Sequence, residues 1–442
     1  MVVRRNKLDA GVGMQNFQYA PDVIQLSHII QMHSTVAYEF LWEYLPLPTV
    51  RSLRRYREKE PLFPLDIEAG TFERAAHHLD IMNWNGPVAV SCDDTKLTPA
   101  LRPYYNKAED QYYLIGAVGK PLILPSLDEF KKIVTQGLAE KATKVALPGV
   151  PAIPSSLNTA TLTEYSWEIL SGLLEKGIKV CSYTCDGAAT EHSVQRNLRT
   201  KASTTKVVRI PHPGREEPIE IRVHFYGKDP IAFIQDPKHA LKTVRNNLYS
   251  GSKCLTFPNN VAMYSQVRDM YHNGCPIRYR DWYRYDKQDD SAATRLTSST
   301  TLKWLVENES TSHLALIIYL FVFGELVDAY GNRSINIRTR VRMVLRAYFF
   351  LETWIQFLRS VNYPLRKHCL SHEAIDIINT LVHGFLESVI IYRDHVHGRQ
   401  PLLPWRMGSS PCERVFGKCR RLVKNFMMVQ FFEMVPKLFI GL

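Results

Sequence analysis

The alternation of hydrophobic and polar positions divides the chain into an α/β part and a helical part. Between residues 86 and 250, short apolar runs bounded by Gly, Pro or Asp alternate with amphipathic segments. This pattern is typical of strands that alternate with helices. Strands are predicted over residues 87–94, 111–119, 144–153, 178–187 and 230–242. The order predicts a mixed five-stranded sheet with helices, an α/β fold whose first strands run antiparallel.

The strand pattern ends near residue 250, and the segments that follow are long and amphipathic or apolar. The most apolar run begins at Leu314 and meets Glu325, which is too short for the ~20 residues that cross a bilayer. We therefore expect a buried helix and no membrane contact. Residues 1–85 are predicted to be helical, with a charge-dense helix over 51–60, and one last helix is predicted over 411–435.

Composition narrows the class of partner. The chain has 442 residues, 45% of them hydrophobic, which suffices for two or three globular domains. Its net charge of +12 favours a polyanionic partner such as nucleic acid. The eight cysteines are scattered and form no CxxC pair, so neither a disulfide framework nor a zinc site is predicted.

Acidic residues recur where predicted elements begin or end. Asp93 and Asp94 end the first strand, Asp186 ends the fourth, and Glu413 lies in the first turn of the last helix. If the two strands are neighbours, these carboxylates meet, and carboxylate oxygens suit Mg²⁺ or Mn²⁺. Two such ions support phosphodiester chemistry. The alternative is that each acid, taken singly, forms a turn or caps a helix.

A second group of charged residues follows the fifth predicted strand. Asp236 ends that strand and is a competing candidate for a metal ligand. His239, Lys242 and Arg245 lie three residues apart on a predicted helix, roughly on one face. They could contact a phosphate backbone or orient the acids. A structural role as the anchor of the following segment is the alternative.

The last predicted helix carries a basic stripe beside Glu413. Arg414, Lys418 and Arg421 are spaced four and three residues apart, which places them near one face. Such a stripe suits contacts with DNA phosphates, and an ordinary solvated helix face is the alternative.

Four segments of the chain together resemble the P-element-like transposases, the group that includes the THAP-domain transposases. The signature D-x-x-H-x-x-K-x-x-R-N, at residues 236–246, is the most specific of them. The match covers roughly residues 85–435 and rests on residues 90–97, 183–198, 236–248 and 411–421. The resemblance implies an α/β RNase H-like catalytic domain interrupted by a large all-α insertion domain. The implied divisions are an N-terminal helical region, 1–85; the first part of the catalytic domain, 86–250; the insertion, 251–405; and a C-terminal helix completing the catalytic domain, 406–442.

Carried onto this sequence, the resemblance implies a catalytic triad of Asp93, Asp186 and Glu413. The triad would hold two Mg²⁺ or Mn²⁺ ions for DNA cleavage and strand transfer. Because neighbouring side chains of a strand point to opposite faces, only one member of the first acid pair can face the site directly. The family pattern selects Asp93, which leaves Asp94 as a supporting or capping acid.

The implied partners are transposon-end and target DNA and further copies of the chain, and the implied location is the nucleus. Two departures from the pattern favour an alternative, a catalytically inactive, domesticated or truncated transposase-derived protein that binds nucleic acid. No cysteine precedes Cys92, so a zinc-coordinating THAP module is not expected. Ser410 stands where the pattern has an acid linked to guanine recognition, which leaves dependence on GTP open. The chain has no G-x-x-x-x-G-K-[ST] loop, so P-loop phosphate binding is excluded.

Overall fold

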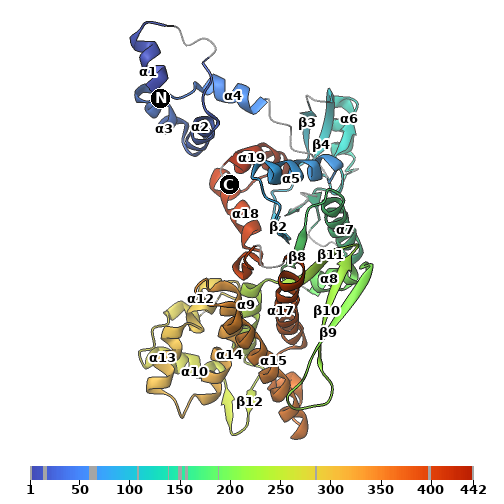
Figure 1. Cartoon of the computed structure of the whole chain (residues 1–442), viewed down its shortest axis with the longest axis vertical. Helices are drawn as coiled ribbons and strands as arrows, with labels where there is room; N and C mark the ends of the chain where they lie inside the picture. Colours follow the sequence, from blue (N-terminus) through green and yellow to red (C-terminus); the bar gives the residue numbers. More distant parts are fainter. Residues whose placement is uncertain are drawn as a thin grey trace.

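The chain is elongated, with sheets at its middle and helices at both ends (Figure 1). The N-terminal helices lie at one end, and a body of helices that follows the main sheet lies at the other. The structure is a computed structural model, and it describes residues 2–12, 17–58, 67–106, 109–137, 139–147, 152–154, 158–187, 189–283, 286–396 and 400–440.

The main sheet has five strands in the order β1-β8-β11-β10-β9. They are β1 (Val88–Ser91), β8 (Val180–Cys185), β9 (Thr204–Ile210), β10 (Ile219–Tyr226) and β11 (Asp229–Gln235). The first three strands in this order are parallel, and β10 pairs antiparallel with both β11 and β9. β8 is buried along its whole length, as expected of a central strand with both faces covered. The carboxyl ends of β1, β8 and β11 therefore meet at one edge of the sheet.

The strand that begins as β1 changes partners at Cys92. Its continuation, β2 (Asp93–Lys96), pairs antiparallel with β6 (Lys144–Leu147), which pairs with β7 (Ala152–Ile153). Cys92 N–H donates to the carbonyl of Thr184 at 2.7 Å, so contact with β8 continues to this point. Asp93 thus stands where the strand leaves β8 and joins β6. A further antiparallel sheet consists of β3 (Arg102–Asn106), β4 (Gln111–Ile115) and β5 (Leu122–Leu124).

The helices packed around the main sheet begin at polar caps visible in the sequence. Asn158 caps α7 (Thr159–Glu175), Asp236 caps α9 (Pro237–Tyr249), and Ser371 caps α17 (His372–Ile391), each by accepting a hydrogen bond from a backbone N–H of the first turn. α8 (Ala189–Thr200) follows β8 directly. α17 packs along β11, so a helix far along the chain covers the middle of the sheet.

The body of helices shares one hydrophobic core with the main sheet. The helices of this body that lie between α9 and α17 are α10 (Tyr264–His272), α11 (Tyr279–Trp282), α12 (Asp290–Leu296), α13 (Ser299–Asn308), α14 (Leu314–Gly331), α15 (Ile337–Ser360) and α16 (Leu365–His368). Among the residues that the structure describes, two helices are long and apolar enough to cross a membrane, α14 and the segment that begins with α17 (His372–Ile391), but both are mostly buried. The predicted buried helix that begins at Leu314 is confirmed as α14.

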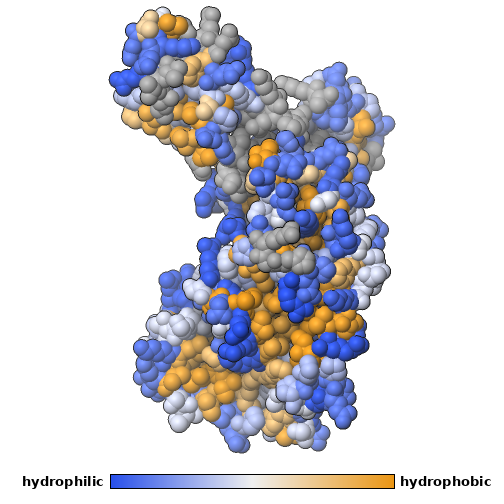
Figure 2. All heavy atoms as spheres, in the orientation of Figure 1, coloured by the Kyte–Doolittle hydropathy of each residue, from blue (hydrophilic) through white to orange (hydrophobic). Residues whose placement is uncertain are grey.

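The remaining helices lie at the N-terminal end, against α7 or beside the two smaller sheets. They are α1 (Val2–Asp9), α2 (Pro21–His33), α3 (Thr35–Tyr44), α4 (Val50–Glu58), α5 (Ala69–Ile81), α6 (Leu127–Thr135), α18 (Ser410–Leu422) and α19 (Met428–Ile440). Figure 2 shows apolar side chains gathered over the body of helices on the visible face, and further apolar side chains on the N-terminal unit. Val36, Phe40 and Tyr44 of α3 are exposed apolar residues of that unit.

Several predicted elements differ from the observed ones. The main sheet has the expected number of strands, but the predicted strand over 111–119 belongs to the separate β3-β4-β5 sheet. The one predicted over 144–153 is two short antiparallel strands. The last predicted strand ends at Gln235, because the Asp236-Pro237 pair starts α9. The last predicted helix is two helices, α18 and α19.

The β9–β10 hairpin was not predicted, although its sequence carries a strand signal. In β10, the buried Ile219, Ile221 and Val223 alternate with more exposed polar residues, which is the period of a strand. The nearby prolines directed the interpretation toward a loop. The expectation of an all-helical segment after residue 250 is wrong at one place, where β12 (Leu255–Phe257) pairs with β13 (Asn260–Ala262). The proposed domain boundaries stay predictions.

Candidate active site

Backbone and side-chain bonds bring the start of α18 to the carboxyl edge of the main sheet. The Ser91 hydroxyl donates to the carbonyl of Gly408 at 2.8 Å, and the Cys412 thiol donates to the carbonyl of Ser91 at 3.2 Å. Ser409 N–H donates to Asp236 Oδ1 at 3.2 Å. These bonds join β1, α18 and α9, three elements that are far apart in the sequence.

Asp93 is half-buried at this edge, and its Oδ1 accepts a hydrogen bond from the N–H of Asp94 at 2.8 Å. Burial raises the pKa of Asp93 to about 7, and the negative charges of Asp186, Asp94 and Glu413 contribute to the rise against that hydrogen bond. The electrostatic influence of both other predicted triad members on Asp93 places the three acids in one neighbourhood.

Asp186 is held by a histidine. His239 Nδ1 lies 2.6 Å from Asp186 Oδ1, and Gly187 N–H donates to the same oxygen at 2.8 Å. Burial alone would raise the pKa of Asp186, but the hydrogen bond and charge of His239 outweigh burial and lower it. A Cβ at Gly187 would stand 2.3 Å from the His239 ring, so only glycine leaves room for this pairing. The Asp-Gly pair therefore has a local steric reason.

Glu413 is held by a lysine. Lys238 Nζ donates to Glu413 Oε2 at 2.9 Å, and the Ser409 hydroxyl lies 3.5 Å from the other carboxylate oxygen. Burial lowers the pKa of Lys238, but the hydrogen bond and charge of Glu413 outweigh it and raise the pKa overall. Lys238 and His239 are adjacent on α9, so one turn of helix holds two of the three acids.

The two further acids proposed as metal ligands have other partners. Asp94 forms an ion pair with Lys144 of β6 at 2.9 Å. Because neighbouring residues of a strand point to opposite faces, this side chain points away from that of Asp93. Asp236 is 3% exposed and accepts from the N–H groups of His239 and Ser409, so it caps α9 and anchors the start of α18. Asp236 therefore fits the capping interpretation, whereas Asp94 is a strand residue held by an ion pair.

The sequence interpretation missed a further acid, Glu191, in the first turn of α8. Its Oε2 is buried and has no hydrogen-bond partner among the described residues. Burial raises the pKa of Glu191 well above its usual value, and the charges of Asp186, Asp93 and Asp94 add to the rise. Its position five residues after Asp186, on the first turn of the next helix, is the sequence signal that could have identified it.

The charges of Asp186 and Glu413 influence the pKa of Asp93, but the side chains of the three acids do not form a cation site in this arrangement. Within the described ranges, no group of three or more His, Cys, Asp or Glu side chains is close enough to hold a metal ion. Lys238 and His239 hold two of the carboxylates instead. The donor set, hard carboxylate oxygens on three elements, nevertheless fits Mg²⁺ or Mn²⁺ in chemistry.

The basic residues of α9 have intramolecular partners. His239 contacts Asp186, and Lys242 lies 3.0 Å from Asp290 of α12. Arg245 is 2% exposed and donates to the carbonyls of Asp286 and Asp289 at 2.7 and 2.9 Å. The assignment of Arg245 to nucleic-acid contact is therefore corrected, because its guanidinium is buried and anchors the segment before α12.

The basic stripe of α18 faces outward next to Glu413. Arg414 and Arg421 are exposed, and Lys418 is half-buried. Arg420, which was outside the predicted stripe, donates to the hydroxyl of Thr95 and ties α18 to β2. The exposed arginines remain available to a polyanion.

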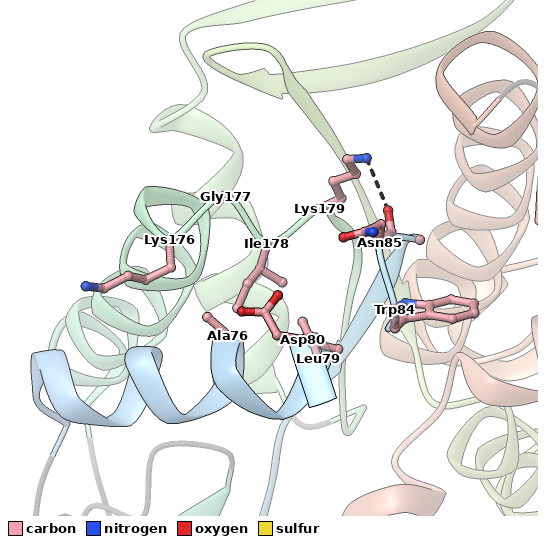
Figure 3. Close-up of a pocket in the computed structure, with 10 residues that line it drawn as sticks. Ala76, Leu79, Asp80, Trp84, Asn85, Lys176, Gly177, Ile178 and Lys179 are labelled. Carbon is pink, nitrogen blue, oxygen red and sulfur yellow. Dashed lines mark hydrogen bonds between the residues drawn. The ribbon is translucent and has the colours of Figure 1, made fainter. Parts of the chain in front are cut away.

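A separate small pocket lies before the amino ends of β1 and β8, at the edge opposite the acids (Figure 3). It is lined by residues of α5, of the segment before β1 and of the turn after α7, and Lys179 Nζ donates to the carbonyl of Asn85 at 3.1 Å. Its position at the other end of these parallel strands separates it from the acidic site.

Comparison with known proteins identifies the fold. No protein-family model matches the chain, and no curated protein matches its sequence. Among solved structures, the chain is similar to the Drosophila P element transposase strand transfer complex, with a TM-score of 0.65 and 16% sequence identity. The similarity covers 99% of this chain and 95% of that chain. The chain therefore has a P-element-like transposase fold, with a mixed sheet and packed helices.

Proposed function

We propose that this protein is a DNA transposase-like polynucleotidyl transferase and endonuclease that uses Asp93, Asp186 and Glu413 as its catalytic triad. The observation that carries the proposal is the position of these acids. They come from β2, the end of β8 and the first turn of α18, and they lie near enough for Asp186 and Glu413 to raise the pKa of Asp93. Strongly shifted carboxylates grouped at the carboxyl edge of a sheet are characteristic of active sites.

The strand order supports an RNase H-like catalytic domain as part of this proposal. Across the strand shared by β1 and β2, the strands run in the order β7-β6-β2/β1-β8-β11. Antiparallel pairing lies on one side of the shared strand and parallel pairing on the other. The mostly helical segment between α9 and α18 would be the insertion domain.

Each acid has a definite role in the proposal. Asp93, Asp186 and Glu413 would hold two Mg²⁺ or Mn²⁺ ions. When bound, such ions activate a water or 3′-hydroxyl and stabilise the leaving oxygen of a phosphodiester. Lys238 and His239 must release Glu413 and Asp186 for this, so these α9 side chains control how many carboxylates are available.

The exposed Arg414 and Arg421, together with Lys418, would contact the phosphates of DNA beside the triad. The proposal includes action on transposon-end and target DNA, a homo-oligomer as the active form, and a nuclear location. GTP binding is not required by this mechanism, and Ser410 at the start of α18 leaves the neighbourhood of Glu413 without an additional acid there.

A catalytically inactive, DNA-binding descendant of a transposase is the second candidate. It is favoured by one observation, the two ion pairs through which Lys238 and His239 occupy the acids. A single assay separates the candidates: Mg²⁺-dependent nicking and strand transfer by the purified chain on element-end DNA, measured beside Asp186→Asn. Activity that is lost in Asp186→Asn supports the enzyme. Activity that persists in this variant would refute the assigned site, and DNA binding without any reaction would support the second candidate.

A further inference from the structure

A polar cleft lies between α8 and α17, apart from the acidic site. Its volume is about 280 Å³, near the lower end of small-ligand pockets (~300–1,000 Å³). One wall consists of α8 side chains that include His192, Arg196 and Arg199, and the other consists of α17 side chains that include Asp376 and His383. In each wall the lining residues recur at helical spacing, so each helix presents one polar face to the cleft.

Both helices are tied to β11 beneath the cleft. Gln195 of α8 donates to the carbonyl of Ile234 at 2.8 Å, and Glu387 of α17 accepts from the N–H of Phe233 at 3.1 Å. A Cβ at Gly384 would stand 2.4 Å from the carbonyl of Phe233, so glycine allows α17 to approach the strand this closely. The walls are therefore fixed by the fold and do not depend on loops.

The buried side-chain atoms of the cleft that lack partners are all nitrogens. Within the described part of the chain, Arg199 Nε, Arg199 Nη2 and His192 Nε2 are buried and have no hydrogen-bond partner. Glu387 Oε1 lies 3.7 Å from Arg199 Nη2, which is beyond hydrogen-bond distance. A buried donor without an acceptor is costly, and such groups in folded proteins call for a bound partner.

The charges in the cleft indicate the kind of partner. Arg196 is 66% exposed at the rim and donates to Asp376 at 3.3 Å, and that carboxylate also contacts His372. The guanidinium of Arg199 lies deeper, with its side chain 27% exposed and 5.3 Å from the ring of Phe233. Two guanidinium groups at different depths match an anion with several acceptor oxygens. Such an anion would satisfy the unpartnered nitrogens of Arg199 and would compete with Asp376 for Arg196.

We propose that the cleft between α8 and α17 binds a phosphate group, with Arg199 as the buried ligand and Arg196 as the rim ligand. Two sources share this chemistry, a backbone phosphate of DNA and a free phosphate compound. DNA is favoured by position, because α8, which forms one wall of the cleft, begins three residues after Asp186. The choice of DNA as the source of the phosphate group rests on the proposed function, whereas the proposal that the cleft binds phosphate does not.

The test is titration of the full chain with inorganic phosphate by calorimetry in a chloride buffer, and with a short duplex of unrelated sequence at several salt concentrations. Arg196→Gln and Arg199→Lys are compared with Arg209→Gln, a matched control on β9 whose arginine pairs with Glu220 outside the cleft. Arg199→Lys removes the planar set of guanidinium donors but keeps the positive charge at this partly buried position. Keeping the charge limits the risk of misfolding.

We expect each cleft variant to bind phosphate about five- to tenfold more weakly than the wild type, and Arg209→Gln to bind as the wild type does. If the duplex competes with phosphate, and Arg196→Gln lowers the salt dependence of duplex binding by about one phosphate contact, the source is DNA. If phosphate binds and the duplex does not compete, the source is a free phosphate compound.

Unchanged affinity for both phosphate and duplex in both cleft variants would overturn the proposal. An equal loss in Arg209→Gln would overturn it too, because the effect would then be one of general charge. Phosphate titration of Asp186→Asn separates this proposal from the proposed function. That variant is expected to bind phosphate as the wild type does, whether or not the chain carries out strand transfer.

Discussion

Two charged regions lie along α8, and they differ in how their charges are balanced. Before the helix begins, Asp93, Asp186 and Glu413 crowd one edge of the sheet, and Lys238 and His239 hold two of them. Along the helix, the cleft toward α17 contains buried nitrogens without acceptors among the described residues. In the acidic region two of the three acids are held by side chains of α9, whereas in the cleft three buried nitrogens of Arg199 and His192 have no hydrogen-bond acceptor among the described residues.

This difference separates two kinds of site. The partners on α9 keep Asp186 and Glu413 compatible with folding, because buried carboxylates without partners are costly. They also make the acids dependent on an exchange of partners before a metal ion can bind. The buried nitrogens of Arg199 and His192 in the cleft require no such exchange, because no hydrogen-bond acceptor holds them among the described residues.

The largest effect is expected from Asp186→Asn. The change keeps the shape of the side chain and removes its charge, so strand transfer should fall by about 10³-fold if the acid stabilises the reaction. Rates are measured on element-end DNA with Mg²⁺. Asp94→Asn is the matched control, since Asp94 pairs with Lys144, and it should retain activity within about twofold. Equal losses in the two variants would contradict the distinction between the acids.

Asp93→Asn is expected to change the pH dependence of stability. Burial raises the folded-state pKa of Asp93 to about 7 from an ordinary value of 3.8. The wild type is therefore relatively stable below pH ~4, where the group is neutral in both states, and loses stability as the pH rises toward 7. The amide of the variant does not titrate and causes no such loss. The metal-free variant should therefore exceed the wild type by about 2 kcal/mol at pH 8 after allowance for solvent screening, and by little at pH 4.

Chemical denaturation at the two pH values measures this difference. Added Mg²⁺ provides the complementary result, because it should stabilise the wild type and leave Asp93→Asn nearly unchanged. A variant that is less stable than the wild type at pH 8 would show that the carboxylate of Asp93 is not destabilised by its surroundings.

A smaller effect is expected from Lys238→Met, which removes the cation that holds Glu413. The half-exposed ion pair competes with metal binding, so its loss should tighten Mg²⁺ binding by a factor of about two to five. The Mg²⁺ concentration that gives half of the thermal stabilisation measures the change. Lys144→Met, which removes the partner of Asp94, should have no such effect. Weaker Mg²⁺ binding in Lys238→Met would mean that the lysine supports the site.

The smallest effect is expected from Arg421→Gln on the exposed side of α18. Loss of one phosphate contact should weaken DNA binding only a few-fold and lower the salt dependence by about one contact. Filter binding or fluorescence anisotropy at several salt concentrations measures both quantities. If the salt dependence does not change, the basic stripe of α18 is an ordinary solvated face.

The sequence was sufficient for features that depend on local pattern. The buried strand β8 and the apolar helix α14 follow from runs and spacing, because neighbouring positions decide them. The position of acids at the ends of β8 and at the start of α18 was equally visible. The β9–β10 hairpin carried a clear alternation too, and only the nearby prolines obscured it.

The partner of each charged group depends on contacts between distant parts of the chain. Arg245 looked like part of a basic face, yet packing against the segment before α12 buries its guanidinium. Lys238 and Glu413 are 175 positions apart, and no local pattern could pair them. The cleft likewise needs α8 and α17, which meet because both are tied to β11. Local sequence determines which secondary-structure element carries a charged residue. The free energy of that charged group depends on its burial and on the partners that long-range packing of the chain brings to it.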